Sequence, residues 1–287
     1  MVPRTGCQTG SMRVAVVGHV EWVSFGSVDR IPGPGEIAHA TDDWEEPAGG
    51  GAVAAVQLAK LAGECGLFTA LGDDEIGLRA REELTDLGLE VHAESREDRT
   101  RRALTLVDPA GERTITTLGH RLQASGGDPL PWERLEEADA VYVTAGDADA
   151  FRFARRARVM VVTTRVLEEL LDADVVPDAL VGSAGDPAEH VDVEVLEWRP
   201  PLLVLTEGRS GGRFETSSGE TGRFKAVEVR GLAGDAYGAG DSFAGGLTYA
   251  LGMGWEVDQA LEFAARCGAA CASGRGPYAG QLGATDL

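Results

Sequence analysis

The sequence contains few aromatic residues, few basic residues and few cysteines, and each shortage excludes a class of protein. Aromatic side chains make up 6% of the 287 residues, whereas hydrophobic residues as a whole make up 43%, so the core is built from Ala, Val and Leu. Such a core favours layers of parallel strands and helices over an aromatic-rich β-sandwich. The length is sufficient for one large α/β domain or two modest ones.

Basic residues are too few to balance the acidic ones. Lys and Arg number 26 against 47 Asp and Glu, which gives a formal net charge of −21. Because a surface this acidic repels phosphate backbones and anionic lipids, we expect neither a nucleic acid nor a membrane as partner. A phosphorylated ligand would need a local binding device, such as a helix N-terminus or a metal ion.

The four cysteines show no metal-ligand spacing. Cys267 and Cys271 lie one helical turn apart among small residues, where buried thiols are expected. The sequence shows no secretory signal and no apolar run of about 20 residues, so we expect a reduced, cytoplasmic protein. Residues 1–11 lack periodicity, and we interpret them as a leader or vector-derived remnant.

Short apolar runs alternate with helical patterns along the chain. Runs such as MRVAVVGHV, GLFTALG and PLLVLTEG indicate buried strands, and AGGGAVAAVQLAKLAG indicates a helix that ends at Gly63. This alternation predicts an α/β fold, a doubly wound parallel sheet flanked by helices, as a single domain over residues 12–287.

Two alternating segments, at about 31–45 and 99–118, do not fit this rhythm. We expect them to pair with each other as a small β-sheet lid over one edge of the domain. Exposed lid strands could also pair across a two-fold axis, which predicts a homodimer formed through the lid.

The segment GDAYGAGDSFAGG carries the pattern with the clearest chemistry. Gly238, Ala239 and Gly240 leave backbone N–H groups bare at the start of an apolar helix, which makes an anion hole without a lysine. Asp241 stands beside this hole, where a carboxylate can accept a proton from a substrate hydroxyl and orient it for in-line attack. A turn in which Asp241 only caps the helix is the structural alternative.

Five segments in the same order resemble the motifs of the ribokinase-like (PfkB) carbohydrate kinase family. They are AGGGAVAAVQLAKLAG, LVDPAGERTIT, VLTEGRSGG, GDAYGAGDSFAGG and ALEFAARCGAACA, and the resemblance extends over nearly the whole chain from Met12. It implies an ATP-dependent kinase that transfers the γ-phosphoryl group to a hydroxyl of a small sugar or sugar-like substrate.

The resemblance also implies roles for individual residues. Asp241 matches the catalytic base, and Gly238, Ala239 and Gly240 match the anion hole. The positions implied for ATP binding are Thr206, Gly208, Gly211, Ser183, Asp235, Ala264 and Gly268. Magnesium is implied at Asp186 and Glu189, where Ser183 and Asp186 replace the ends of the family's N-x-x-E stretch. A solvated loop pair is the alternative for Asp186 and Glu189.

The substrate positions depart from the family pattern. Predicted substrate-binding residues are Glu21, Gly49, Gly50, Gly51, Val53 and Arg113. Val53 stands where the family often has Asn, Glu21 lies near the place of an Asp that grips sugar hydroxyls, and Ala236 replaces the signature Thr. The substrate is therefore less polar than a free hexose, or is held through Glu21 or through Arg113 from the lid.

Two other functions compete with a sugar kinase. A nucleoside kinase would use the same scaffold, with Val53 and Trp22 flanking the base. A ligand-binding protein that has lost the chemistry would explain the altered substrate positions. The intact anion hole and Asp241 favour an enzyme, because a decayed site has no need of a carboxylate there.

Overall fold

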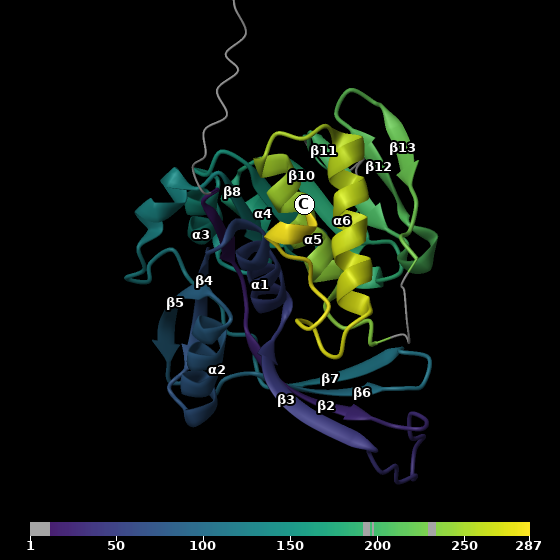
Figure 1. Ribbon diagram of the computed structural model, residues 1–287. Helices are drawn as coiled ribbons and strands as arrows, with labels where there is room; N and C mark the ends of the chain where they lie inside the picture. The colour runs from purple at the N-terminus through teal and green to yellow at the C-terminus, as the bar shows by residue number, and fades with distance from the viewer. Residues whose placement is uncertain (1–11, 192–195, 197, 229–233) are drawn as a thin grey trace, which may run out of the picture.

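The computed structural model describes residues 12–191, 196, 198–228 and 234–287 (Figure 1). The predicted leader at 1–11 lies outside the described residues, as does Cys7. The other three cysteines are buried free thiols. Within the described ranges, every helix is too short or too polar to cross a membrane.

A nine-stranded sheet forms the centre of the molecule (Figure 1). Its strand order is β13-β12-β11-β10-β9-β8-β1-β4-β5, and every pairing from β11 to β5 is parallel. The pairings β11–β12 and β12–β13, at one edge, are antiparallel. The strands are β1 (Val14–Val17), β4 (Cys65–Gly72), β5 (Leu89–Arg96), β8 (Ala140–Val143), β9 (Met160–Thr163), β10 (Ala179–Ser183), β11 (Leu202–Thr206), β12 (Gly212–Thr216) and β13 (Thr221–Phe224).

Helices cover both faces of this sheet. One buried cluster contains residues of α1 (Gly50–Ala62), α2 (Glu75–Asp86), α5 (Ala239–Gly252) and α6 (Val257–Ala272). The other contains residues of α3 (Ala148–Ala154) and α4 (Leu167–Ala173). Successive residues of β1 alternate between the two clusters, so this strand is apolar throughout, as in a parallel sheet buried on both sides. The prediction of a doubly wound α/β fold is confirmed.

A separate four-stranded sheet forms the lid, at the lower side of the molecule in Figure 1. We call it the lid sheet; its order is β3-β2-β6-β7. The strands are β2 (Glu21–Ser27), β3 (Asp42–Ala48), β6 (Arg102–Val107) and β7 (Arg113–Leu118). A small sheet lid is thus confirmed, and its β6–β7 hairpin lies within the predicted segment 99–118.

The other half of the lid differs from the prediction. Only residues 42–45 of the predicted segment 31–45 are strand, and that strand continues to Ala48. The two predicted segments do not pair with each other, because β2 lies between β3 and β6. Sequence reasoning missed β2 because Trp22, Val23 and Phe25 are all buried, so the strand lacks the alternation of an exposed lid.

Candidate active site

The N-terminus of α5 has the geometry of an anion site. Its N-cap, Gly238, has φ 76°, and a Cβ there would lie only 2.8 Å from Cγ1 of Val53, so glycine alone fits. The backbone N–H groups of Gly240 and Asp241 have no acceptor among the residues that the structure describes. Unpaired donors at the positive end of a helix dipole attract an anion.

Asp241 lies in the first turn of α5, beside these donors. Its carboxylate makes no hydrogen bond to any residue of the described ranges. Burial, and next the negative charge of Glu189, raise its pKa to about 6, although Arg113 and Arg165 act in the opposite direction. Such a carboxylate is ionised at neutral pH and still basic enough to take a proton.

The glycines that precede and begin α1 bring Asp241 close to the β1–β2 loop. A Cβ on Gly50 would lie 2.8 Å from Oδ1 of Asp241, and one on Gly51 would lie 2.7 Å from the backbone of His19. A Cβ on Gly49 would lie 3.2 Å from Cγ of Glu21. The absence of side chains at these positions therefore allows the start of α1 to lie close to Asp241, His19 and Glu21.

Charged side chains gather around Glu21. We call His19, Glu21, Arg101 and Arg121 the acceptor end, and Gly238–Asp241 the phosphoryl end, after the roles that the sequence predicts for Glu21 and for Asp241 with its glycines. Oε1 of Glu21 lies 3.1 Å from Nε of Arg101 and 3.7 Å from Nε2 of His19. Burial, followed by the positive charges of Arg121, Arg101 and Arg165, lowers the pKa of His19 to about 3, so His19 is neutral at physiological pH.

The lid hairpin reaches the phosphoryl end. The N–H of Ala236 donates to the carbonyl of Gly111 at 3.1 Å, which joins the β6–β7 turn to the segment before α5. The charge of Arg113 lowers the pKa of Asp241, whereas the arginines that act on Glu21 are Arg101 and Arg121. Arg113 thus acts at the phosphoryl end.

The predicted ATP positions divide into two groups. Ser183 and Thr206 are paired at the ends of β10 and β11, and Gly208 and Gly211 follow β11 in left-handed or positive-φ conformations. They lie at the carboxyl edge of the sheet, where α/β proteins bind ligands. At Gly211 a Cβ would lie 2.1 Å from the carbonyl oxygen of Phe224, so this turn needs glycine.

The remaining ATP positions are buried in packing contacts. Ala264 is fully buried, and a Cβ on Gly268 would lie 3.0 Å from the carbonyl oxygen of Ala239, so both residues serve the contact of α6 with α5. Asp235 is 3% exposed and accepts hydrogen bonds from the N–H groups of Tyr237 and Gly276. Ala264, Gly268 and Asp235 therefore contribute to the packing of α6 on α5 and to the turn before α5, and their contacts with ATP stay a prediction.

Two predicted substrate contacts are also buried. Val53 is fully buried under Gly238, and Trp22 is 2% exposed, with its indole N–H donating to Glu45 at 3.2 Å. Neither the indole ring of Trp22 nor the methyl groups of Val53 are therefore exposed for contact with a nucleoside base. Val53 instead supports the turn that exposes the N–H groups of α5.

The carboxylates predicted to hold magnesium are engaged with an arginine. Arg165 donates to Asp186 at 2.5 Å and to Glu189 at 2.6 Å. Their other oxygens accept the N–H groups of Ala188 and Ser183. The part of the chain that the structure describes holds no group of three His, Cys, Asp or Glu residues that could bind a metal ion. These residues do not fit a metal ion coordinated directly by the protein.

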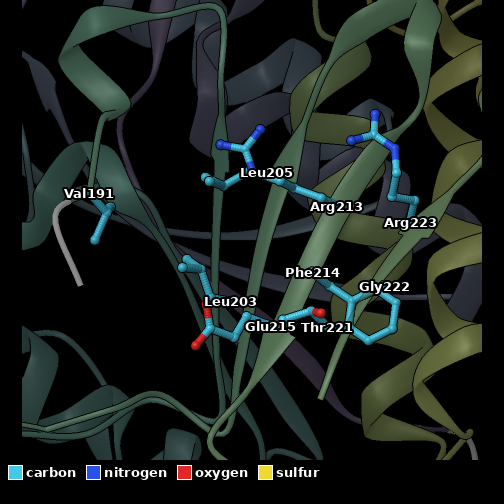
Figure 2. A pocket seen from close by; sticks show the side chains of 9 residues that line it. All are labelled: Val191, Leu203, Leu205, Arg213, Phe214, Glu215, Thr221, Gly222 and Arg223. Atoms are coloured by element: carbon cyan, nitrogen blue, oxygen red, sulfur yellow. The ribbon is translucent and has the colours of Figure 1, made fainter. Parts of the chain in front are cut away.

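A cavity of about 520 Å³ lies elsewhere, along β11–β13 (Figure 2). Arg213 and Arg223 project at one end of it, and Leu203 and Leu205 line its floor. Leu203 belongs to the buried cluster of α3 and α4, on the face opposite α5. The cavity is therefore separate from Asp241 and its neighbours.

Sequence reasoning missed four residues of the site, namely His19, Arg101, Arg121 and Arg165. His19, Arg101 and Arg121 lie in loops that follow β1, β5 and β7, three strands that are far apart in the sequence. A signal for one existed, because RTRR at 99–102 is a basic run in a strongly acidic chain.

Comparison with known proteins gives consistent matches over the whole length. Residues 11–173 and 177–282 match the pfkB family carbohydrate kinases. An ATP-dependent ribose-1-phosphate kinase of Halopiger xanaduensis is 29% identical over 92% of this chain and 93% of its own. The structure of a putative ribokinase from Agrobacterium tumefaciens superposes with a TM-score of 0.81 at 22% identity, covering 96% of both chains. Arabidopsis thaliana ribokinase, solved with ribose and ATP, gives a TM-score of 0.74 at 18% identity, covering 96% of this chain and 97% of its own.

Proposed function

Because the chain belongs to the pfkB family of carbohydrate kinases, and is thus a phosphotransferase with an alcohol acceptor, we propose that Asp241 is its catalytic base. The acceptor is a ribose-like sugar, and the donor is the γ-phosphoryl group of ATP. One observation carries this proposal: Asp241 is a carboxylate without a hydrogen-bond partner in the described ranges, beside the bare N–H groups that begin α5.

The proposed reaction uses the two features together. The sugar hydroxyl lies beside Asp241, and its oxygen attacks the γ-phosphorus while the bond from that phosphorus to the ADP oxygen breaks. The hydroxyl proton passes to Asp241. The N–H groups of Gly240 and Asp241 and the helix dipole stabilise the charge on the transferring group, and Arg113 adds a positive charge from the lid.

ATP binding is proposed at the loop Gly208–Gly211 and the ends of β10 and β11. These segments share the carboxyl edge of the sheet with the start of α5. Magnesium is proposed only as an ion that accompanies the triphosphate, since Asp186 and Glu189 are bound to Arg165.

The names of the relatives suggest two acceptors, ribose and ribose 1-phosphate. A nucleoside is less favoured, because Trp22 and Val53 are buried and leave no apolar surface for a base. Dimerisation through the lid stays a prediction; every residue of β7, the edge strand of the lid sheet, is exposed in the single chain.

The test is a measurement of ADP formation with ATP, magnesium and a panel of acceptors: D-ribose, D-ribose 1-phosphate, D-fructose and adenosine. We expect turnover with a ribose compound and little with adenosine. Turnover confined to adenosine, or none with any acceptor in a folded sample that binds ATP, would contradict the proposal.

A further inference from the structure

The hydroxyl of Thr105, on strand β6 of the lid sheet, is buried without a hydrogen-bond partner among the described residues. The whole residue is buried, and its Oγ1 has neither access to solvent nor a donor or acceptor within reach. Thr105 lies beside Phe25 of β2 in the ladder, and the ring centroid of Phe25 lies 5.0 Å from that of Tyr237 in the main domain. Thr105 therefore faces the domain, where an unpaired buried hydroxyl is costly.

Thr105 also lies on the side of the lid that reaches the phosphoryl end. It pairs with Ile115 of β7, so the two side chains share the inner face of the lid sheet. Arg113, two residues before Ile115, shares that face, and its charge acts on Asp241. Ile115 is 42% exposed whereas Thr105 is fully buried. Thr105 thus lies where the covered part of the inner face meets its open part.

Tyr237 places a second hydroxyl beside the same part of the lid. Its ring packs edge-on against Phe25, and its Oη accepts the N–H of Gly49 at 3.3 Å. The hydroxyl proton of Tyr237 has no acceptor in the part of the chain that the structure describes, although the residue is only 6% exposed. Burial, and next the negative charges of Glu21 and Asp241, raise the pKa of Tyr237, so its hydroxyl remains protonated and able to donate a hydrogen bond.

We propose that Thr105 and Tyr237 are specificity-determining residues, each of which forms a hydrogen bond with a hydroxyl group at C2 or C3 of the acceptor. This inference rests on the proposed function, which places the reacting hydroxyl beside Asp241. A hydroxyl both donates and accepts, so it suits the neutral hydroxyl groups of a sugar, with or without a phosphate elsewhere on the molecule. Val53 has no polar side-chain group for this purpose, and the two hydroxyls supply such contacts from the lid side.

Both hydroxyls are closed off in this conformation, so the acceptor enters with the lid displaced. Within the described residues, the lid sheet shares no strand pairing with the central sheet. Its movement away from the domain separates Phe25 from Tyr237 and exposes Thr105. Closure over the bound acceptor then gives both hydroxyls their missing partners, as lids do when they complete a site.

The chain offers a matched control for each residue. Thr69 of β4 is also fully buried with an unpartnered Oγ1 in the described ranges, but it belongs to the central sheet. Tyr249 is as buried as Tyr237, but it packs against Trp255 and lies about 12 Å along α5 from Asp241. Because an unpaired buried hydroxyl does not stabilise the fold, Thr→Val at either threonine should keep or raise the thermal midpoint.

The first test measures kcat and KM at saturating ATP for the better of D-ribose and D-ribose 1-phosphate, and for its 2-deoxy and 3-deoxy forms. We expect Thr105→Val and Tyr237→Phe each to raise KM for the full sugar about 3- to 10-fold, the range for one neutral hydrogen bond, with kcat within about twofold. Each increase should vanish for the deoxy form that lacks the hydroxyl bound by that residue. Thr69→Val and Tyr249→Phe should leave KM within about twofold. Unchanged KM in Thr105→Val and Tyr237→Phe, or equal increases for all three sugars, overturns the inference.

The second test does not depend on turnover. Calorimetry measures binding of D-ribose and D-ribose 1-phosphate to Asp241→Asn with and without Thr105→Val, after thermal melting has shown that both proteins are folded. Binding about 3- to 10-fold weaker in the double variant supports the inference even if no acceptor is phosphorylated, an outcome that would refute only the proposed function. Equal binding in the two proteins, or no binding of either sugar to Asp241→Asn, overturns the inference, whereas turnover of a ribose compound by the wild type would still support the kinase proposal.

Discussion

At the phosphoryl end the structure offers backbone N–H groups and one carboxylate, whereas at the acceptor end it offers charged side chains from separate loops. The phosphoryl end lies within four consecutive residues, Gly238–Asp241, whose geometry the start of α5 fixes. The acceptor end combines His19 and Glu21 near β1 and β2 with Arg101 and Arg121 at either end of the lid hairpin. A site made of backbone groups is appropriate for the phosphoryl group, which is the same in every reaction cycle. A site made of side chains is appropriate for the acceptor, because side chains can distinguish one acceptor from another.

This difference predicts that changes at the phosphoryl end affect the rate for all acceptors, and changes at the acceptor end affect the choice among them. The largest effect is expected for Asp241→Asn. Loss of a general base typically lowers the rate by about 10²–10⁴-fold, so kcat should fall in that range for every acceptor while ATP affinity changes little.

Steady-state kinetics and titration with a nonhydrolysable ATP analogue measure these two quantities. Turnover within about threefold of the wild type would exclude Asp241 as the catalytic base, since such a change corresponds to under about 1 kcal/mol of barrier.

Gly50→Ala should give the next largest effect. The added methyl group would lie 2.8 Å from Oδ1 of Asp241 and would displace the carboxylate or the acceptor hydroxyl. Because small misplacements of reacting groups can cost about 10²-fold, we expect kcat/KM to fall by about 10- to 100-fold for ribose and ribose 1-phosphate alike.

The thermal midpoint of Gly50→Ala should be preserved, as alanine is a better helix former than glycine in α1. Gly127→Ala, where the nearest atom to a new Cβ lies 3.8 Å away, is the matched control. A fall in kcat/KM for only one of the two acceptors would show that Gly50 contributes to acceptor selection. It would contradict the division of roles between the phosphoryl end and the acceptor end.

The pH dependence of kcat/KM tests the role of Asp241 at the phosphoryl end. Burial raises the pKa of Asp241 to about 6 and lowers that of His19 to about 3, so His19 stays neutral over the range in which Asp241 titrates. Burial also raises the pKa of Glu21, against the opposing charges of Arg101 and Arg121. With D-ribose as acceptor, kcat/KM should fall about tenfold per unit as the pH drops below about 6, because the protonated carboxyl cannot accept the hydroxyl proton. A pH–rate profile from 5 to 8 measures this limb, and a flat profile would contradict the role of Asp241.

Every residue of the phosphoryl end was predicted from the sequence, whereas Glu21 was the only residue of the acceptor end to be predicted, for a physical reason. Gly238, Ala239, Gly240 and Asp241 are contiguous, so one segment contains both the backbone turn and the carboxylate. Arg101 and Arg121 come together only because β6 and β7 form a hairpin whose two ends lie near His19. No local pattern encodes that convergence.

Burial bears on the predictions for small and apolar residues. Small or apolar side chains in a helix, such as Val53 and Ala264, are compatible with a ligand contact or with a packing contact, and the sequence does not distinguish the two. Both residues are fully buried beside α5, and their contacts with a ligand stay a prediction. The strand β2 was missed for a related reason. Both of its faces are covered, so its sequence lacks the alternation of apolar and polar residues that marks an exposed lid strand.

The smallest predicted effect concerns the stability cost of the unpaired carboxylate. The pKa of Asp241 is raised from 3.8 to about 6 in the folded protein, mainly by burial, so folding disfavours its ionised form. The cost is absent below about pH 4, where the carboxyl is protonated in both states, and complete above about pH 6. Asp241→Asn should therefore raise the free energy of unfolding by about 1–3 kcal/mol at pH 8 and by little at pH 4.

Urea denaturation at the two pH values measures this difference, with Asp172→Asn, at an exposed carboxylate of α4, as control. A variant that is equally stable at pH 8, or less stable, would mean that Asp241 is satisfied in the fold. The carboxylate would then be part of the scaffold, and the phosphoryl end would lose the unpaired group that distinguishes it from the ion pairs of the acceptor end.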